Sequence, residues 1–131
     1  MIGRLFASAL VLLAGLAGAQ EAVEAPGGRV RLLDRLTGEL SDLDLSRGQS
    51  MTVGRLTVGL LECRYPAENP AADSWMHLVI TDVAVEGPVF SGWMLSSSPA
   101  LSALDNPRYD VWVLGCVLPE GALPATSEGQ G

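Results

Sequence analysis

Alternation of apolar and polar residues is the dominant pattern along the chain, and it predicts strands. The segment 42–45 reads Asp-Leu-Asp-Leu, and the same period of two recurs over 56–60 and 76–80. The segments 89–95 and 109–116 are rich in aromatic and β-branched residues, which are typical of strands. The chain is therefore predicted to consist mainly of short strands, each with one apolar face.

Glycines and prolines mark the turns between these segments. Gly38 and Gly87 are placed to close turns, and Gly54 is the first residue of a two-residue hairpin turn that Arg55 completes. Pro70 lies in a predicted loop from about residue 64 to residue 73.

One short helical turn is predicted over 98–104, where Ser98 can cap the turn and Pro99 suits its first position. The predicted fold class is all-β: a small antiparallel β-sandwich or barrel of about seven short strands with one short helical turn.

The N-terminus has the parts of a Sec-type secretory signal peptide. Arg4 precedes an apolar run over 5–16, and the small residues at 17–19 form the pattern that signal peptidase accepts. Cleavage between Ala19 and Gln20 would release the protein into the periplasm. The apolar run is shorter than the roughly 20 residues that a membrane span requires, and a retained N-terminal anchor is the alternative.

Four regions follow. Residues 1–19 are the expected signal peptide, and the small, acidic, Gly/Pro-containing segment 20–28 is an expected flexible lead. Residues 29–118 form the β-rich domain, and the Pro/Gly/Ser-containing tail 119–131 is expected to be disordered. No apolar run after residue 19 has spanning length, so no transmembrane segment is expected in the mature chain.

The charge balance argues against nucleic-acid partners. The net charge is −7, and it becomes −8 when Arg4 leaves with the signal peptide. All eight basic residues are arginines, and they are scattered along the chain. Phosphate backbones and anionic lipid surfaces would repel such a protein.

The two cysteines, Cys63 and Cys116, are predicted to form a disulfide. An even pair in a small exported domain is usually bonded in an oxidising compartment. The alternative, a redox-active pair, lacks the Cys-x-x-Cys spacing that such pairs commonly have.

Five stretches carry a motif string that resembles a known family. They are Leu-Asp-Arg-Leu-Thr-Gly at 33–38, Cys-Arg-Tyr-Pro at 63–66, Phe-Ser-Gly-Trp-Met at 90–94, Ser-Pro-Ala-Leu-Ser-Ala-Leu at 98–104 and Pro-Arg-Tyr-Asp-Val-Trp at 107–112. Together they resemble the bacterial family of domain of unknown function 2155 (DUF2155), over nearly the whole domain.

The resemblance implies a small exported protein of α-proteobacterial type, with no assigned activity, substrate or cofactor. Genes of the family often lie near one for an accessory subunit of respiratory complex I, which points to an envelope or respiratory role. The chain departs from the family pattern at Asn106, where a His is expected before Pro107. A chemical task of that His would not be performed here in the same way.

Catalytic chemistry has few candidates. His77 is the only histidine, and Ser96, Ser97 and Ser98 are candidate nucleophiles for it. These serines lack the Gly-x-Ser-x-Gly turn that presents a hydrolase serine, and serines before a helical turn commonly cap it. The chain is therefore predicted not to be an enzyme, with a Ser–His hydrolase as the alternative.

Metal ligands are also sparse, and neither a metal nor any other cofactor is predicted. Two acidic groups are candidate calcium ligands: Glu39 with Asp42 and Asp44, and Asp105 with Asp110. Neither matches a calcium loop with oxygen ligands at alternate positions and a required glycine. Alternate aspartates in a strand are more simply its solvated face.

Aromatic residues give the best candidates for a contact surface. Trp75, Trp93, Arg108 and Tyr109 are the predicted partner or ligand contacts, because rigid aromatics beside arginine suit protein contacts or sugar stacking. Trp93 could equally belong to the core. Trp112 alternates with Leu114 and Cys116, so it is predicted to be buried on the disulfide's face.

These features predict a non-catalytic periplasmic module that binds or helps to assemble an envelope protein partner, whose identity the sequence does not give. The alternative is a small-ligand or glycan-binding domain that uses exposed tryptophans.

Overall fold

A computed structural model describes residues 21–98, 104 and 106–119. These residues form strands and loops and no helix, so the all-β prediction is confirmed. The eight strands are β1 (Ala22–Ala25), β2 (Gly27–Asp34), β3 (Leu40–Ser46), β4 (Ser50–Val53), β5 (Leu56–Pro66), β6 (Trp75–Asp82), β7 (Pro88–Leu95) and β8 (Tyr109–Val117).

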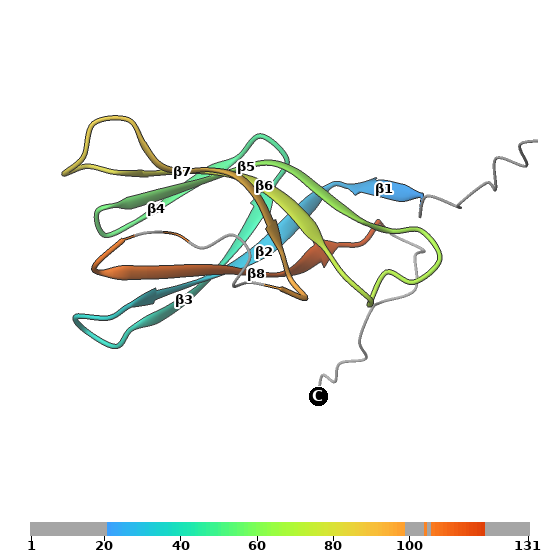
Figure 1. Cartoon of the computed structure of the whole chain (residues 1–131), viewed down its shortest axis with the longest axis horizontal. Helices are drawn as coiled ribbons and strands as arrows, with labels where there is room; N and C mark the ends of the chain where they lie inside the picture. Colours follow the sequence, from blue (N-terminus) through green and yellow to red (C-terminus); the bar gives the residue numbers. More distant parts are fainter. Residues whose placement is uncertain (1–20, 99–103, 105, 120–131) are drawn as a thin grey trace, which may run out of the picture.

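The strands form two antiparallel sheets that pack face to face (Figure 1). Sheet A has the order β1-β5-β6-β7, and β4 also pairs with β5. Sheet B has the order β3-β2-β8. A buried cluster of residues from both sheets fills the space between them, so the fold is a sandwich rather than a closed barrel.

Residue alternation places one face of each strand in this core. In β6, Met76, Leu78 and Ile80 are fully buried, whereas Trp75 and His77 point to the outer face of sheet A. The alternation predicted for 76–80 is therefore confirmed. Burial of these apolar side chains is the main stabilising contribution, at about 25 cal/mol per Å² of apolar surface removed from water.

The predicted glycine turns are confirmed. Gly38, Gly54 and Gly87 all have positive φ angles, and they lie between β2 and β3, β4 and β5, and β6 and β7. Glycine adopts this conformation without the steric cost that a Cβ atom brings.

A disulfide joins Cys63 of β5 to Cys116 of β8, and so links the two sheets as predicted. The prediction for Trp112 was wrong. Val111 and Val113 face the core, and Trp112 lies half-buried on the outer face of sheet B opposite Arg31. A β-bulge leaves Leu114 unpaired and adds one residue between Trp112 and Cys116. The two side chains therefore face opposite sides of sheet B, although simple alternation would place them on the same side.

The first strand corrects the predicted N-terminal boundary. The segment 20–28 was expected to be a flexible lead, but β1 pairs with the end of β5 and β2 begins at Gly27. Ala25 is buried, because alternation in β1 turns its side chain toward the core.

Several predictions fall on residues outside those described. The signal peptide at 1–19, the interior of the helical turn at 99–103 and the tail from 120 onward all lie there. Within the described residues, no helix is long and apolar enough to cross a membrane.

Candidate functional site

The outer face of sheet A carries a cluster of aromatic and charged side chains, here named the outer-face patch. Cross-strand pairing builds it in two neighbouring rows. One row runs from Arg64 through Trp75 to Leu95, and the other from Glu62 through His77 to Trp93.

Trp93 is the centre of the outer-face patch. Its indole stacks on the His77 ring, with centroids 4.9 Å apart and planes 24° apart. Trp93 nevertheless keeps 38% of its surface exposed, although large aromatics are usually buried. The stack covers one face of the indole and fixes its orientation.

Arg64 adds a positive charge to the same surface. Its guanidinium carbon lies 6.0 Å from the Trp93 ring centroid, at the outer limit of a cation–π contact. Its Nη2 also donates to Glu62 Oε1 at 3.0 Å. The outer-face patch therefore combines an ordered indole with a partly exposed ion pair.

The other two predicted contact residues lie elsewhere. Tyr109 is 1% exposed and belongs to the core, so it is not a surface residue. Arg108 lies at the end of the sandwich that carries the turns, where its guanidinium carbon is 5.2 Å from the Tyr109 ring centroid. Of the four predicted contacts, Trp75 and Trp93 therefore lie in the outer-face patch, whereas Arg108 and Tyr109 lie together at the end that carries the turns.

Arg108 takes part in a set of polar contacts here named the turn network: Asp34, Arg55, Asp82, Asn106 and Arg108. Arg108 donates Nε and Nη2 to the two carboxylate oxygens of Asp34, at 3.2 and 2.9 Å. Asp34 also accepts from the backbone N–H groups of Leu36 and Thr37. The hydrogen bonds from Arg108, assisted by those of the turn, hold the pKa of Asp34 at about 2.

Asn106 is the buried centre of the turn network. Its Oδ1 accepts from the backbone N–H groups of Arg108 and Tyr109 at 2.9 and 3.0 Å, and its Nδ2 donates to Asp82 at 3.2 Å. The backbone N–H of Ala84 lowers the pKa of Asp82, and the contacts from Asn106 and Arg55 add to this effect. These contacts give position 106 a structural role, and a neutral histidine could make part of them, because one ring nitrogen accepts one hydrogen bond and the other donates.

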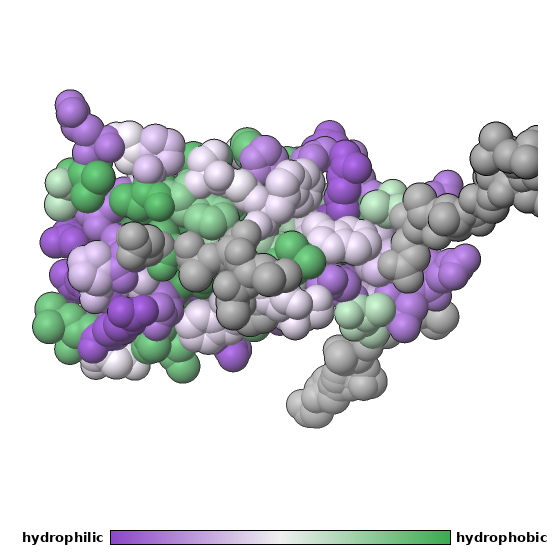
Figure 2. All heavy atoms as spheres, in the orientation of Figure 1, coloured by the Kyte–Doolittle hydropathy of each residue, from purple (hydrophilic) through white to green (hydrophobic). Residues whose placement is uncertain are grey.

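Exposed apolar side chains surround the turn network. Leu36 and Val83 are each more than 75% exposed, and Val85 is 51% exposed. On the face seen in Figure 2, hydrophobic residues gather on the half of the molecule that carries the turns, beside strongly hydrophilic ones.

Comparison with known proteins gives the family. The sequence model described as "Uncharacterized protein conserved in bacteria (DUF2155)" matches residues 28–116. The chain belongs to the DUF2155 family. The resemblance drawn from the motif string is therefore confirmed.

This DUF2155 chain is also similar to an uncharacterised protein of Rickettsia prowazekii (strain Madrid E), with 27% identity over 92 residues. The match covers 68% of the chain and 59% of the relative, so the chain spans less than two thirds of that relative's length. No solved structure matches the chain.

The fold of this DUF2155 chain separates the residues of the Ser–His alternative. His77 stacks on Trp93, and no hydrogen bond joins it to Ser96, Ser97 or Ser98 among the described residues. Instead, Ser96 Oγ and the Ser97 N–H donate to the Asp73 carboxylate, each at 3.1 Å. Burial raises the pKa of Asp73, but hydrogen bonds from Ser97, Ser74 and Ser96 outweigh burial and lower it overall.

Three of the acidic residues considered as metal ligands are paired with arginines, and Asp105 lies outside the described residues. Asp42 and Asp44 on β3 bind Arg31 and Arg29 on β2, and Asp110 binds Arg35. Across the part of the chain that the structure describes, no three His, Cys, Asp or Glu side chains converge as a metal site.

Two residues were not predicted from the sequence: Arg64 as a contact residue, and Asn106 as a buried side chain that hydrogen-bonds Asp82 and the backbone at the start of β8. Arg64 lies in the motif stretch 63–66, which was a usable signal, but its closeness to Trp93 depends on two strand registers. The role of Asn106 depends on contacts to Asp82, 24 residues away in sequence. No local pattern encodes such a contact.

Proposed function

We propose that this chain is an exported, non-catalytic binding module that holds a protein partner of the cell envelope against its outer-face patch. The observation that carries the proposal is the stacked but exposed indole of Trp93, with Arg64 and Glu62 beside it. Interface hot spots are rich in tryptophan and arginine. An indole fixed by His77 has little side-chain entropy left to lose when a partner binds.

Two matched variants test this role. Trp93→Ala removes the centre of the outer-face patch, and Trp112→Ala removes a half-buried tryptophan from the outer face of the other sheet. We expect wild-type protein and Trp112→Ala to retain a stoichiometric partner from solubilised envelopes. Trp93→Ala should lose at least about 30-fold in affinity, since a hot-spot tryptophan is worth about 2 kcal/mol or more.

Two results would count against this function. One is a clean monomer with nothing retained by the wild-type protein. The other is equal retention by Trp93→Ala and Trp112→Ala. Thermal unfolding of both variants checks that either change leaves the domain folded.

Export is a separate part of the proposal. It is supported by the signal-like N-terminus and by the Cys63–Cys116 disulfide, since such bonds persist in oxidising compartments. Mass spectrometry of periplasmic protein should give a chain that begins at Gln20. An unprocessed cytoplasmic chain with two free thiols would contradict export.

A glycan-binding module is the second candidate function. The Trp93 indole is held by His77 yet stays partly exposed, and an exposed aromatic ring suits stacking against a sugar ring. Peptidoglycan fragments should then change Trp fluorescence in the wild type and not in Trp93→Ala. No response across a panel of glycans would remove this candidate.

A further inference from the structure

The two sulfurs of the disulfide differ in access. Cys63 lies within the long strand β5 and has no exposed surface. Cys116 is only partly buried and is the second-last residue of β8, which forms an edge of sheet B. Of the two cysteines, Cys116 at the end of an edge strand is therefore the more accessible residue.

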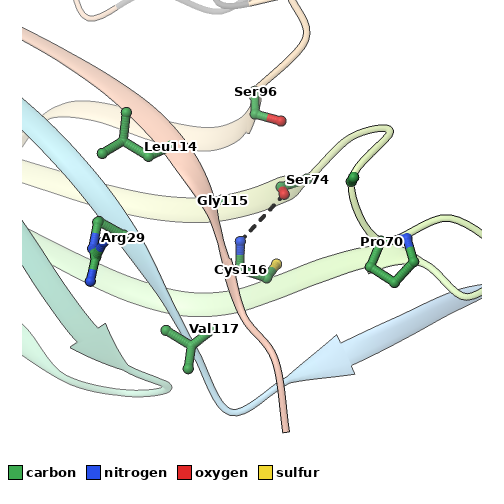
Figure 3. Close-up of a pocket in the computed structure, with 9 residues that line it drawn as sticks. Arg29, Pro70, Ser74, Ser96, Leu114, Gly115, Cys116 and Val117 are labelled. Carbon is green, nitrogen blue, oxygen red and sulfur yellow. Dashed lines mark hydrogen bonds between the residues drawn. The ribbon is translucent and has the colours of Figure 1, made fainter. Parts of the chain in front are cut away.

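A cavity of about 420 Å³ opens beside Cys116 (Figure 3). Pro70 and Ala71 from the β5–β6 loop line it, together with Ser74, Ser96 and the end of β8. Figure 3 shows Cys116 next to Ser74, whose Oγ accepts the Cys116 N–H at 3.3 Å. Gly115, which also lines the cavity, has no side chain to fill it. A Cβ atom built there would be in ordinary contact with Ser74 Oγ, at 3.7 Å.

We propose that Cys116 is the site of thiol–disulfide exchange with an external thiol, such as the reactive cysteine of an oxidoreductase. The incoming thiolate attacks Cys116 Sγ from the cavity. Its sulfur forms a bond to Cys116, the bond between Cys116 and Cys63 breaks, and Cys63 leaves with the electron pair and takes up a proton. The same steps in reverse form the disulfide: the Cys63 thiolate attacks the mixed disulfide at Cys116 and releases the external thiol.

A competing effect favours attack at the other sulfur. Attack at Cys63 would release Cys116, which is the more solvated of the two and so the better leaving group. Cys63, however, is surrounded by core atoms. A Cβ built on Gly28 would lie within 3.0 Å of both Cys63 Sγ and the Met76 side chain. A thiolate can reach Cys63 only after the two sheets separate. The end of an edge strand opens more often than the whole sandwich. Attack is therefore faster at Cys116, although Cys116 is the better leaving group.

Single-thiol variants test this order of access. Cys63→Ser leaves the Cys116 thiol, and Cys116→Ser leaves the Cys63 thiol. With the chromogenic disulfide DTNB, we expect the Cys116 thiol of the folded protein to react at least tenfold faster than the Cys63 thiol. The two rates should become equal in denaturant. A Cys63 thiol that reacts as fast or faster in the folded state would overturn the proposal.

The intact protein gives a second measurement that does not depend on how these variants fold. Wild-type protein is treated with reduced glutathione under native conditions, quenched with acid and digested with trypsin. Cleavage after Arg55, Arg64 and Arg108 puts Cys63 in the peptide 56–64 and Cys116 in the peptide 109–131. The glutathione adduct is expected on 109–131, and an adduct found mainly on 56–64 would overturn the proposal.

Two neighbouring alanines test the route through the cavity. Ala71 and Ala72 are both exposed, and of the two only Ala71 lines the cavity. Ala71→Leu should slow adduct formation at Cys116 several-fold, and Ala72→Leu should leave its rate unchanged. Equal rates in the two variants would rule out attack through this cavity.

Discussion

Leu61 and Leu114 each lie two residues before a bonded cysteine, and each is the unpaired residue of a β-bulge. The register of β5 shifts between Leu60 and Glu62, and that of β8 shifts at Leu114. A bulge adds one residue and so reverses which side chains face the core. The two bulges turn both sulfurs inward, on strands whose preceding alternation would have turned them outward.

Loss of the disulfide should destabilise the domain. The bond closes a loop with a sequence separation of 53, which corresponds to about 4 kcal/mol of unfolded-state entropy in the chain-entropy model. A double variant, Cys63→Ala with Cys116→Ala, should therefore unfold at a clearly lower urea concentration than the oxidised wild type. Chemically reduced wild-type protein is the control and should shift in the same direction. An unchanged midpoint would contradict the prediction.

Histidine should replace Asn106 better than alanine does. Asn106→Ala leaves two backbone N–H groups without their acceptor and removes a donor to Asp82, which should cost about 2–3 kcal/mol. Asn106→His can accept from one of the two backbone N–H groups and donate to Asp82, so it should recover part of the lost stability. Urea unfolding of the three proteins measures this, and equal losses in both variants would contradict the structural role of position 106.

Acid should weaken the fold partly through Asp34. The pKa of Asp34 is about 2 in the folded chain and about 3.9 for an unperturbed aspartate. The unfolded chain therefore binds the proton more tightly, and the stabilisation is complete above about pH 4 and lost as the pH falls to about 2. The difference in unfolding free energy between wild type and Asp34→Asn should shrink over this range. A constant difference from pH 5 to pH 2 would contradict it.

Two turn glycines should respond differently to alanine. Gly54 and Gly48 both have positive φ angles, which cost an alanine about 1–2 kcal/mol. A Cβ at Gly54 would also lie 2.6 Å from the Tyr109 hydroxyl, whereas a Cβ at Gly48 meets nothing within 4 Å. Gly54→Ala should therefore lower the unfolding free energy by about 1 kcal/mol or more beyond Gly48→Ala. Equal losses of unfolding free energy in the two variants would contradict the prediction, because they would show that the Tyr109 side chain moves away from the new Cβ atom with no loss of stability.

Sequence patterns predicted the strands and turns well because both signals are local. Alternation in 76–80 identifies β6, and Gly54 identifies the tight β4–β5 turn. The pairing of Cys63 with Cys116 followed from an even cysteine count. These features needed no knowledge of which strands lie side by side.

The errors came where pairing between strands overrides the local pattern. β1 has no strong signal of its own and forms because the end of β5 offers it a partner. Trp112 was assigned to the wrong face because the bulge at Leu114 is invisible in the sequence. The prediction of Tyr109 as a contact residue was wrong because an aromatic beside Arg108 suits a surface contact, whereas β8 turns Tyr109 into the core.

The position of the disulfide also sets how the domain would carry tension. Gly27 lies opposite Val117 in the β2–β8 pair, so the start of β2 and the end of β8 meet at the end of the sandwich away from the turns (Figure 1). A pull on the C-terminal end of β8 would separate β8 from β2 one hydrogen bond at a time, beginning at this pair. The closed bond at Cys116 stops the unzipping after one residue and passes the force across the core to β5, whereas reduction would let β8 peel away.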